Sequence, residues 1–368
     1  VNVGYINKRF ELFKPDFLFE FLQSKLITTQ VEFDVWMANE GKGGYKYVYL
    51  AKGKQFNFSG KIIDLKTLGT EYVFGSTTDF ANRPRINILK EISKTNFNIG
   101  YNVVKGIRRE GITGDIHGQT IYGSIEGVSI RVDGGVTAKN GYHLCGVAFC
   151  TCKHSNIYVI GESLKTNQAL QYAHNGTDVE GAFNCDMIEC NIDVRGGDGE
   201  DGSSSDNLSS GGHGGRGGNA VAYTQCSILE KCVAYVTGGK GGNGGNGRAA
   251  QLPTVNGGSG GWGGRGGDAI TFKDCTGIDK ESFITHSACA GDGGNGGNGG
   301  TAYPTSNYTS TGGAGGTGGD GGDIYISKKL LSHCAVGTGG AGGNGGEAGG
   351  GYAGSAGQPG DIGSKYTL

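Results

Sequence analysis

The sequence predicts an all-β protein: a right-handed parallel β-helix with stacked polyglycine II helix excursions and an N-terminal cap that contains a short helix. Three observations predict this fold. Short apolar segments with alternating polarity recur along the chain, glycine-rich tracts repeat a Gly-Gly-x triplet, and these tracts occur in pairs between the recurring segments. The right hand follows from the usual handedness of parallel crossover connections.

Composition divides the chain into three parts, because glycine is concentrated in the second half. Residues 1–45 are expected to be a cap or attachment region, 46–195 the entry and first coils of the β-helix, and 196–368 further coils with paired glycine tracts and distal loops. Glycine makes up 77 of the 368 residues, whereas proline contributes only 5. Collagen is therefore excluded, since its triple helix needs abundant proline and glycine at every third position.

A short helix is expected in the cap. Asp16 is a suitable N-cap residue, and four apolar residues follow it at nearly helical spacing, namely Phe17, Phe21, Leu22 and Leu26. A helix at this place would close one end of the solenoid, as terminal repeats must. Residues 47–65 then alternate like strands that enter such a solenoid.

Related segments follow at intervals and carry the repeat. They begin at Gln119, Cys145, Val179, Asn219, Asp268 and Asp323, and each is expected to hold two short strands. Units this small cannot each bury an apolar face, but a stack of them buries a continuous one. An antiparallel sandwich with coincidental similarity between segments is the alternative.

The repeat also predicts columns of like residues inside the stack. Aligning the segments places an aromatic or apolar residue at one position, namely Phe149, Phe183, Tyr223, Phe272 and Ile326. A second column three residues later contains Cys152, Cys226 and Cys275. Most of the 10 cysteines are expected to be reduced and buried.

The glycine tracts have the period of a polyproline II helix, which makes one turn in three residues and has no internal hydrogen bonds. They span residues 196–202, 211–218, 238–247, 257–267, 291–300, 312–322, 337–347 and 354–360. With two glycines in each triplet, neighbouring helices could approach closely enough to hydrogen-bond through their backbones. Flexible linkers are the alternative, since glycine-rich chains commonly behave as coils.

Pairing of the tracts favours order. Each repeat ends in an outgoing tract, a tip without repeated glycine follows, and a returning tract leads to the next repeat. The tips are residues 203–210, 248–256, 301–311 and a short turn around Tyr352. Ten residues of such a helix span about 30 Å, so the tips would be held far from the sheets. We expect the third-position asparagines to form a column between layers, and Trp262 to cover an open edge of the stack; stacking of Trp262 on a sugar is the alternative.

Several classes of function are disfavoured. The formal net charge of −2 gives no basic surface for nucleic acid, and no apolar run is long enough for membrane insertion. The cysteines lack paired CxxC motifs, and the glycine tracts lack the lysine of a phosphate-binding loop. The sequence therefore predicts no metal and no cofactor.

Gly-Gly-x tracts that carry variable loops resemble the receptor-recognising adhesins at the tips of long tail fibres in T-even-like bacteriophages. The resemblance covers about residues 196–360 and rests on repeats such as GGKGGNGGNG and GGAGGTGGDGG. It implies a virion protein, made in the host cytoplasm, whose partners are phage tail fibre proteins and a bacterial outer-surface protein or polysaccharide. Tailspikes are trimers and the adhesins monomers, so both states are open. Mycobacterial glycine-repeat proteins and springtail antifreeze proteins share the triplet.

In the adhesin family, loops that join the glycine helices contact the bacterial surface, which assigns that role here to the tips. The receptor-binding candidates are Asp206, Asn207, Gln251, Tyr303, Thr305, Ser306, Asn307, Tyr308 and Tyr352. Tyrosine offers an apolar ring with a polar end, and serine and asparagine supply adaptable hydrogen bonds. Ordinary exposed turns are rich in the same polar residues, which is the alternative for any one of them.

Two other functions are open. A polysaccharide-cleaving tailspike, a glycosidase or lyase, would carry paired carboxylates on the solenoid face, and the candidates are Glu162, Asp186, Glu189 and Asp193. They form no motif of fixed spacing, so a role without catalysis is favoured. A structural or ice-binding surface protein is the third possibility, although bulky and charged third-position residues make an ice-binding face irregular.

Overall fold

The computed structural model describes residues 23–38, 44–58, 63–65, 68–89, 121–133, 143–161, 163, 173–204, 210–277, 286–304, 311–326, 333–348 and 352–367. Over these residues the chain forms strands in three parallel sheets, together with one short α-helix and one short 3-10 helix, η1 (Phe80–Asn82). The prediction of an all-β protein with parallel strands is confirmed. Neither of the described helices has the length and apolar character that crossing a bilayer requires.

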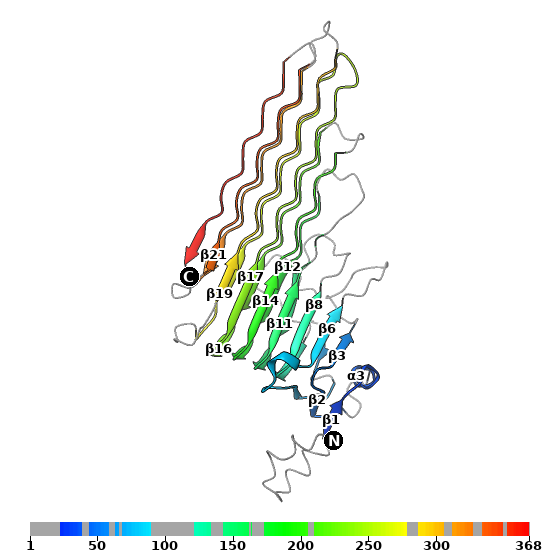
Figure 1. The fold of residues 1–368 in the computed structure, drawn as a ribbon, viewed down its shortest axis with the longest axis vertical. Coiled ribbons are helices and arrows are strands. Elements are labelled where there is room, and N and C mark those ends of the chain that lie inside the picture. The colour runs from blue at the N-terminus through cyan, green and yellow to red at the C-terminus, as the bar shows by residue number, and fades with distance from the viewer. Residues whose placement is uncertain are drawn as a thin grey trace, which may run out of the picture.

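Each sheet collects strands from distant parts of the sequence (Figure 1). The first contains β1 (Ser24–Ile27), β2 (Tyr47–Leu50), β4 (Ile63–Asp64), β5 (Tyr72–Phe74), β7 (Ile121–Glu126), β10 (Cys150–Lys153), β13 (Asp186–Ile188) and β16 (Ser227–Glu230). The second contains β3 (Gln55–Phe58), β6 (Arg85–Leu89), β8 (Ser129–Asp133), β11 (Asn156–Ile160), β14 (Asn191–Arg195), β17 (Val233–Thr237), β19 (His286–Cys289) and β21 (His333–Ala335). The third contains β9 (His143–Ala148), β12 (Asp178–Phe183), β15 (Ala220–Thr224), β18 (Ala269–Lys273), β20 (Ile324–Ile326) and β22 (Lys365–Thr367).

From β9 to β17, successive strands lie in the third, first and second sheets in turn, and we call one such set of strands a coil. One coil is β9, β10 and β11, the next is β12, β13 and β14, and each strand pairs in parallel with its equivalent one coil later. The prediction of two strands per repeat is therefore wrong for these coils, which have three. One strand of the second coil, β13, has only three residues, which are too few to show a period.

Corners between strands use the left-handed backbone region. Phe149, Asn184, Gln225 and Asp274 follow the third-sheet strands of successive coils, and all have φ between 48° and 55°. The N–H groups of the first three donate to the next coil, as from Asn184 to the Thr224 carbonyl at 2.9 Å. Asparagine and aspartate adopt this region more readily than most residues, so the corner geometry repeats although the residue type does not.

Side chains that point inward form the core in register. Ile157, Ile192 and Ala234 are neighbours on three coils and are fully buried. Tyr223 and Phe272 are paired on adjacent strands, and their rings stack with centroids 5.4 Å apart. This alternation, with one face in the core, is what sets the register of each strand.

The predicted aromatic column is only partly correct. The pairing of β12 with β15 sets Phe183 beside Thr224, one residue away from Tyr223, and Phe149 lies in a corner and contacts Phe183 edge-on. The pairing of β18 with β20 sets Ile270 beside Tyr325, so Ile326 is also out of line with Phe272.

The cysteine column is real but contains a different first member. The register places Cys150, Cys185, Cys226 and Cys275 in line, whereas Cys152 pairs with Met187. The described cysteines are free thiols, and most of them are buried.

The amino-terminal part differs from the expected helix. Leu26 lies in β1 and pairs with Tyr49 of β2, and residues 16–22 lie outside the described residues. The helix of this region is α3 (Gln30–Met37), which begins at the Thr29 and Glu32 capping box. Its Phe33 is fully buried, and the ring stacks on Phe56 of β3 at 5.1 Å. The expected strands within residues 47–65 are present as β2, β3 and β4.

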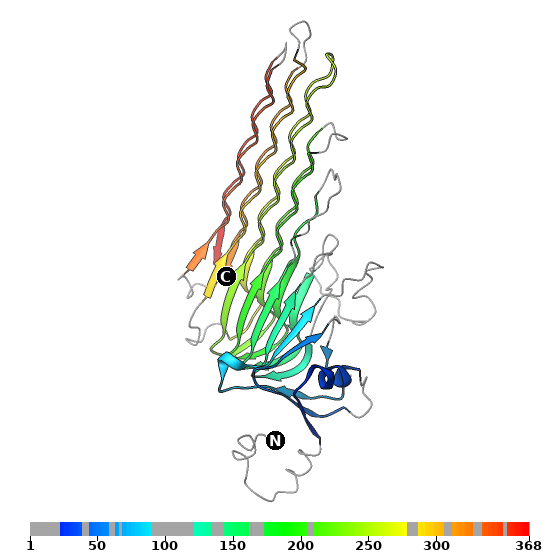
Figure 2. The same cartoon turned by 45° about the vertical axis from the view of Figure 1, so that its right-hand side comes forward.

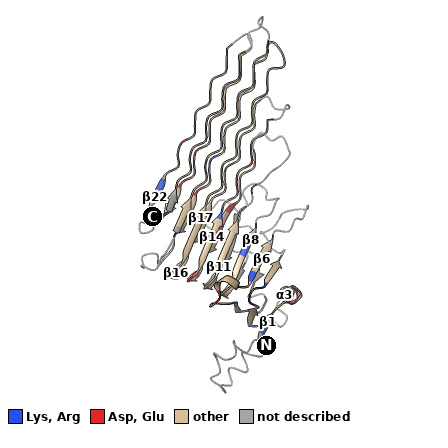
Figure 3. Cartoon of the chain, viewed as in Figure 1, with Lys and Arg blue, Asp and Glu red and all other residues tan. Residues whose placement is uncertain are grey.

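Glycine tracts extend the second and third sheets along the long axis of the molecule (Figure 1). An outgoing tract follows each of β14, β17, β19 and β21, and a returning tract leads into β15, β18, β20 or β22. Turning the molecule by 45° shows the tracts lying side by side in pairs (Figure 2). Charged residues are sparse along them (Figure 3).

Candidate functional site

Backbone hydrogen bonds bind the tracts into two layers, which we call the slab. Within the outgoing layer, the first glycine of a triplet donates to the neighbouring tract, as from Gly241 to the Asp292 carbonyl at 2.8 Å. The second glycine donates across to the other layer, as from Gly242 to Gly215 at 2.8 Å. Both kinds of bond recur along the tracts, so each tract is fixed by its neighbours on more than one side.

Side chains at the third position of each Gly-Gly-x triplet form the remaining hydrogen bonds between neighbouring tracts. The Oδ1 of Asn243 accepts the N–H of Asn295 at 2.9 Å, and the Oδ1 of Asn295 accepts the N–H of Ala341 at 2.9 Å. A second ladder joins Asn246, Asn298 and Asn344 in the same way. These side chains therefore satisfy the third N–H of the triplet, which explains the choice of asparagine and aspartate at this position.

The asparagine ladders lie on the outer face of the outgoing layer, where their side chains are exposed. The expected column is thus confirmed, but its expected place between the layers is wrong. Only glycine fits there: a Cβ on Gly241 of an outgoing tract would lie 1.9 Å from the carbonyl oxygen of Gly264 on a returning tract. The layers are therefore too close for any side chain between them.

Trp262 is also placed differently from the expectation. It lies on a returning tract that has neighbouring tracts on both sides, since its N–H donates to Nδ1 of His213 at 3.0 Å and its carbonyl accepts from Gly214. On the other side, Gly263 donates to the Thr317 carbonyl. The indole is 61% exposed, so it stands on a face of the slab rather than at an edge.

Three of the predicted receptor-binding residues lie in described parts of the tips, at the end of the slab. Gln251 is exposed in a turn, Tyr303 is half-buried, and Tyr352 is 83% exposed. The other six lie outside the described residues, namely Asp206, Asn207, Thr305, Ser306, Asn307 and Tyr308. Sequence reasoning missed Leu252 and Val255, which are exposed apolar residues of the second tip; the signal for them was an apolar pair inside a polar loop.

Hydrogen bonds continue into the bases of the tips. Ala250 donates to the Thr301 carbonyl at 2.8 Å, and Ala302 donates to the Glu347 carbonyl at 2.9 Å. The first excursion is shorter than the second. Ser204 of the first tip accepts the N–H of Asn246, which lies in the second outgoing tract, two residues before the second tip begins. Successive tips are therefore held in a fixed relation to one another.

The candidate catalytic carboxylates are not gathered into one site. Glu189 contacts Nδ1 of His154 at 2.8 Å, and Asp193 forms an ion pair with Arg195 at 2.9 Å. Asp186 is exposed on β13 of the first sheet, whereas Asp193 lies on β14 of the second. Glu162 lies outside the described residues. The described carboxylates thus engage basic neighbours or solvent, and the hollow described next contains none of them.

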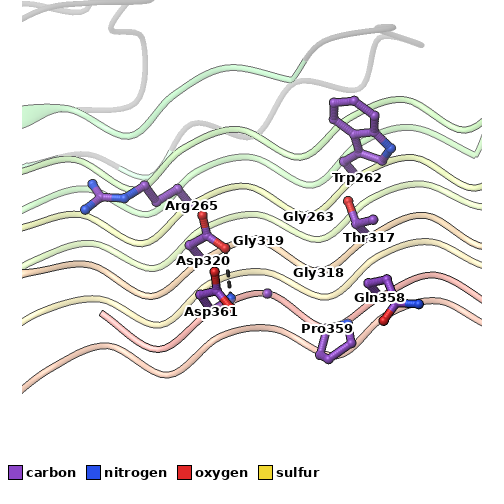
Figure 4. A pocket seen from close by; sticks show the side chains of 11 residues that line it. Trp262, Gly263, Arg265, Thr317, Gly318, Gly319, Asp320, Gln358, Pro359 and Asp361 are labelled. Atoms are coloured by element: carbon purple, nitrogen blue, oxygen red, sulfur yellow. Dashed lines mark hydrogen bonds between the residues drawn. The ribbon is translucent and has the colours of Figure 1, made fainter. Parts of the chain in front are cut away.

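A hollow is present on the outer face of the returning layer (Figure 4). Its lining comprises Trp262, Gly263, Arg265, Thr317, Gly318, Gly319, Asp320, Gln358, Pro359, Gly360 and Asp361. The sequence does not reveal that these residues line one hollow, because they come from three tracts whose relative register only the fold determines.

One cluster of cysteines has the ligands for a soft metal. The Sγ atoms of Cys150, Cys152 and Cys185 lie within 4.8 Å of one another, and all three residues are buried. Hydrogen bonds with Cys150 and Cys185, together with burial, raise the pKa of Cys152. Metal binding needs the thiolate form. Despite burial, hydrogen bonds with Cys152 and Cys185 lower the pKa of Cys150, whereas the pKa values of Cys152 and Cys185 are raised, so one thiol of the three favours the charged form.

Comparisons with known proteins give little. No protein-family model matches the sequence, and no curated protein matches it. Among solved structures, the chain aligns with the nine polyproline type II helical bundle springtail antifreeze protein from Granisotoma rainieri, whose crystal waters match the ice lattice. The alignment has 25% sequence identity, covers 46% of this chain and 98% of that chain, and has a TM-score of 0.11. A TM-score this low carries no conclusion about the fold or the function of this chain.

Proposed function

We propose that the protein is a receptor-binding protein at the tip of a bacteriophage tail fibre, and that its tips bind a bacterial outer-surface protein or polysaccharide. In this proposal the three sheets form a right-handed parallel β-helix and the tracts are polyglycine II helices. Residues 1–45 would attach the protein to other tail fibre proteins in the virion.

The observation that carries the proposal is the fixed projection of the tips. Each tip joins two tracts that are hydrogen-bonded to their neighbours in both layers, so the ends of each loop are held in place before a ligand arrives. Preorganised loops lose less conformational entropy on binding. Tyr352, Gln251 and Leu252 supply exposed aromatic, amide and apolar groups there, a mixture suited to recognition.

The alternatives have weaker support. For cleavage of a polysaccharide, the described carboxylates do not form an opposed pair in a cleft. For ice binding, the outer faces of the slab carry Lys240, Trp262 and Arg265 among smaller residues, and such bulky side chains interrupt a regular lattice of polar groups.

Cell adsorption tests the proposal. Replacing residues 248–256 and 301–311 by serine should remove or redirect binding of the labelled protein across a panel of bacterial strains. The matched control replaces exposed residues away from the tips, Asp198 and Lys240, by serine and should bind as the original does. Unchanged adsorption of the tip variant would contradict the proposal.

Two further measurements separate the alternatives. Release of oligosaccharides from purified envelope polysaccharide would support the cleaving tailspike, and thermal hysteresis of ice growth would support the ice-binding protein. Sizing in solution decides between the monomer and the trimer.

A further inference from the structure

The hollow on the returning layer lies between two columns of side chains. One column contains Trp262, Thr317 and Gln358, and the other contains Arg265, Asp320 and Asp361, one triplet nearer to the sheets. Backbone bonds hold the columns in register, as from Gly263 to the Thr317 carbonyl and from Gly318 to the Gln358 carbonyl. Residues from three tracts thus face one space, as Figure 4 shows.

Glycines and a proline make the floor of the hollow. Gly263, Gly318, Gly319 and Gly360 lie between the columns, and Pro359 occupies a place where most triplets have glycine. Adjacent third positions are about 9 Å apart along such a tract, from a rise of about 3.1 Å per residue. The space is therefore a shallow trough with a side-chain column along each wall and the Pro359 ring in its floor.

Trp262 gives one wall an apolar platform. Its side chain is 61% exposed, although its backbone is fixed by hydrogen bonds to His213 and Gly214. The ring centroids of Trp262 and His213 are 5.0 Å apart, so the imidazole supports the indole from the neighbouring tract. A large exposed aromatic on a rigid support is typical of a binding surface.

The other wall is negatively charged. Asp361 donates its N–H to Oδ1 of Asp320 at 2.8 Å, which sets the two carboxylates next to each other. Arg265 does not offset them, because its guanidinium is bound to Asp268 and Asp323, each at 2.8 Å. Among the described residues, neither Asp320 nor Asp361 forms an ion pair. The wall therefore offers hydrogen-bond acceptors and repels anions.

We propose that this trough binds an uncharged sugar unit of a glycan. The apolar C–H face of a sugar ring would pack on Trp262, and its hydroxyls would donate to Asp320 and Asp361, with Gln358 and Thr317 as further partners. Two adjacent carboxylates would repel a uronic or sialic acid. The site is independent of the tips, so its test does not depend on the proposed receptor binding.

Tryptophan fluorescence can locate the binding. The protein has 2 tryptophans, and Trp36 is buried with its indole N–H donating to Oγ1 of Thr70 at 3.3 Å. The probes are maltohexaose, N-acetylchitohexaose and a galactose hexasaccharide, with an oligogalacturonate of similar length as the acidic probe. At least one neutral probe should shift the emission to shorter wavelength and protect Trp262 from acrylamide quenching. If none of the neutral probes changes the emission, the proposal is wrong.

Variants then test the two walls, with affinities from calorimetry. Trp262→Ala should weaken binding of the neutral probe about tenfold or more, whereas Trp262→Tyr should retain most of it. Tyr235→Ala, which removes a 45% exposed aromatic from β17, is the matched control and should bind normally. Equal affinities of Trp262→Ala and the original protein for the neutral probe would show that the sugar does not pack on Trp262.

The charged wall has its own variant. Asp320→Asn combined with Asp361→Asn keeps an oxygen to accept the N–H at position 361 but removes both charges, and should let the acidic probe bind. Continued exclusion of that probe would contradict the role of the carboxylates. A protein with serine-substituted tips should still bind the neutral probe, so this proposal and that of receptor binding by the tips can fail separately.

Discussion

Single third-position residues hold the slab together through one acceptor each. Replacing Asn295 by alanine removes the partner of the Ala341 N–H, which it accepts at 2.9 Å. Water can replace part of this bond at the surface, so the free energy of unfolding should fall by only about 1 kcal/mol. Thermal unfolding measures the loss. Asn295→Asp keeps the oxygen and serves as the control; an equal loss in both variants would show that the accepted bond is not the cause.

Buried thiols make stability depend on pH in the alkaline range. Burial raises the pKa of Cys232 to about 11, above the value near 8.5 of an exposed cysteine. Because the folded state holds this proton more tightly, the thiol of Cys232 adds to the free energy of unfolding. This contribution is complete below pH 8 and is lost as the pH rises towards 11. The melting temperature of the original protein should fall more steeply from pH 8 to 11 than that of Cys232→Ala. Parallel curves would contradict this.

At the scale of the element, each tract depends on the absence of side chains between the layers. Gly241→Ala would bring a Cβ to 1.9 Å from the Gly264 carbonyl oxygen of the opposite layer, and backbone cannot move aside as a flexible side chain can. The expected cost exceeds about 3 kcal/mol, and amide hydrogen exchange should accelerate across residues 238–267. Lys240→Ala changes an exposed residue of the same tract and should leave exchange slow. Slow exchange in both variants would refute the close packing of the layers.

An element could be predicted from the sequence when it contained enough residues to show its period. The triplet repeats over whole tracts, so their pairing was predicted, whereas β13 has three residues and shows no period. The aromatic column failed by one residue at Phe183, because the segments were aligned by residue type, whereas the strand pairing sets Phe183 beside Thr224. The Thr29 and Glu32 capping box was a readable signal for α3, but apolar spacing further upstream was preferred to it.

At the scale of the whole molecule, the register between tracts decides which side chains meet. Trp262, Thr317 and Gln358 come from three excursions and share a column only because each returning tract leads into a paired strand of the third sheet. No pattern within one repeat predicts that meeting. The tips, in contrast, follow directly from where the triplets stop, which is why residues such as Gln251 and Tyr352 could be named in advance.

This architecture makes stability a sum over neighbouring coils, as in other repeat proteins. Asn219 and Asp268 occupy equivalent positions, since the N–H of Asn219 binds Oδ1 of Asp178 and that of Asp268 binds Oδ1 of Asn219. Deleting residues 219–267 removes one coil with its excursion and brings Asp268 to the place of Asn219. The shortened protein should fold, with a sheet signal in circular dichroism and slow exchange in the remaining tracts.

Deleting residues 219–266 is the control, because it leaves one extra residue and shifts the register. The shift turns core side chains outward, so this variant should unfold at a lower temperature. Equal stability of the two deletions would mean that coils do not stack by register, and the fixed geometry of both tips and trough would lose its basis.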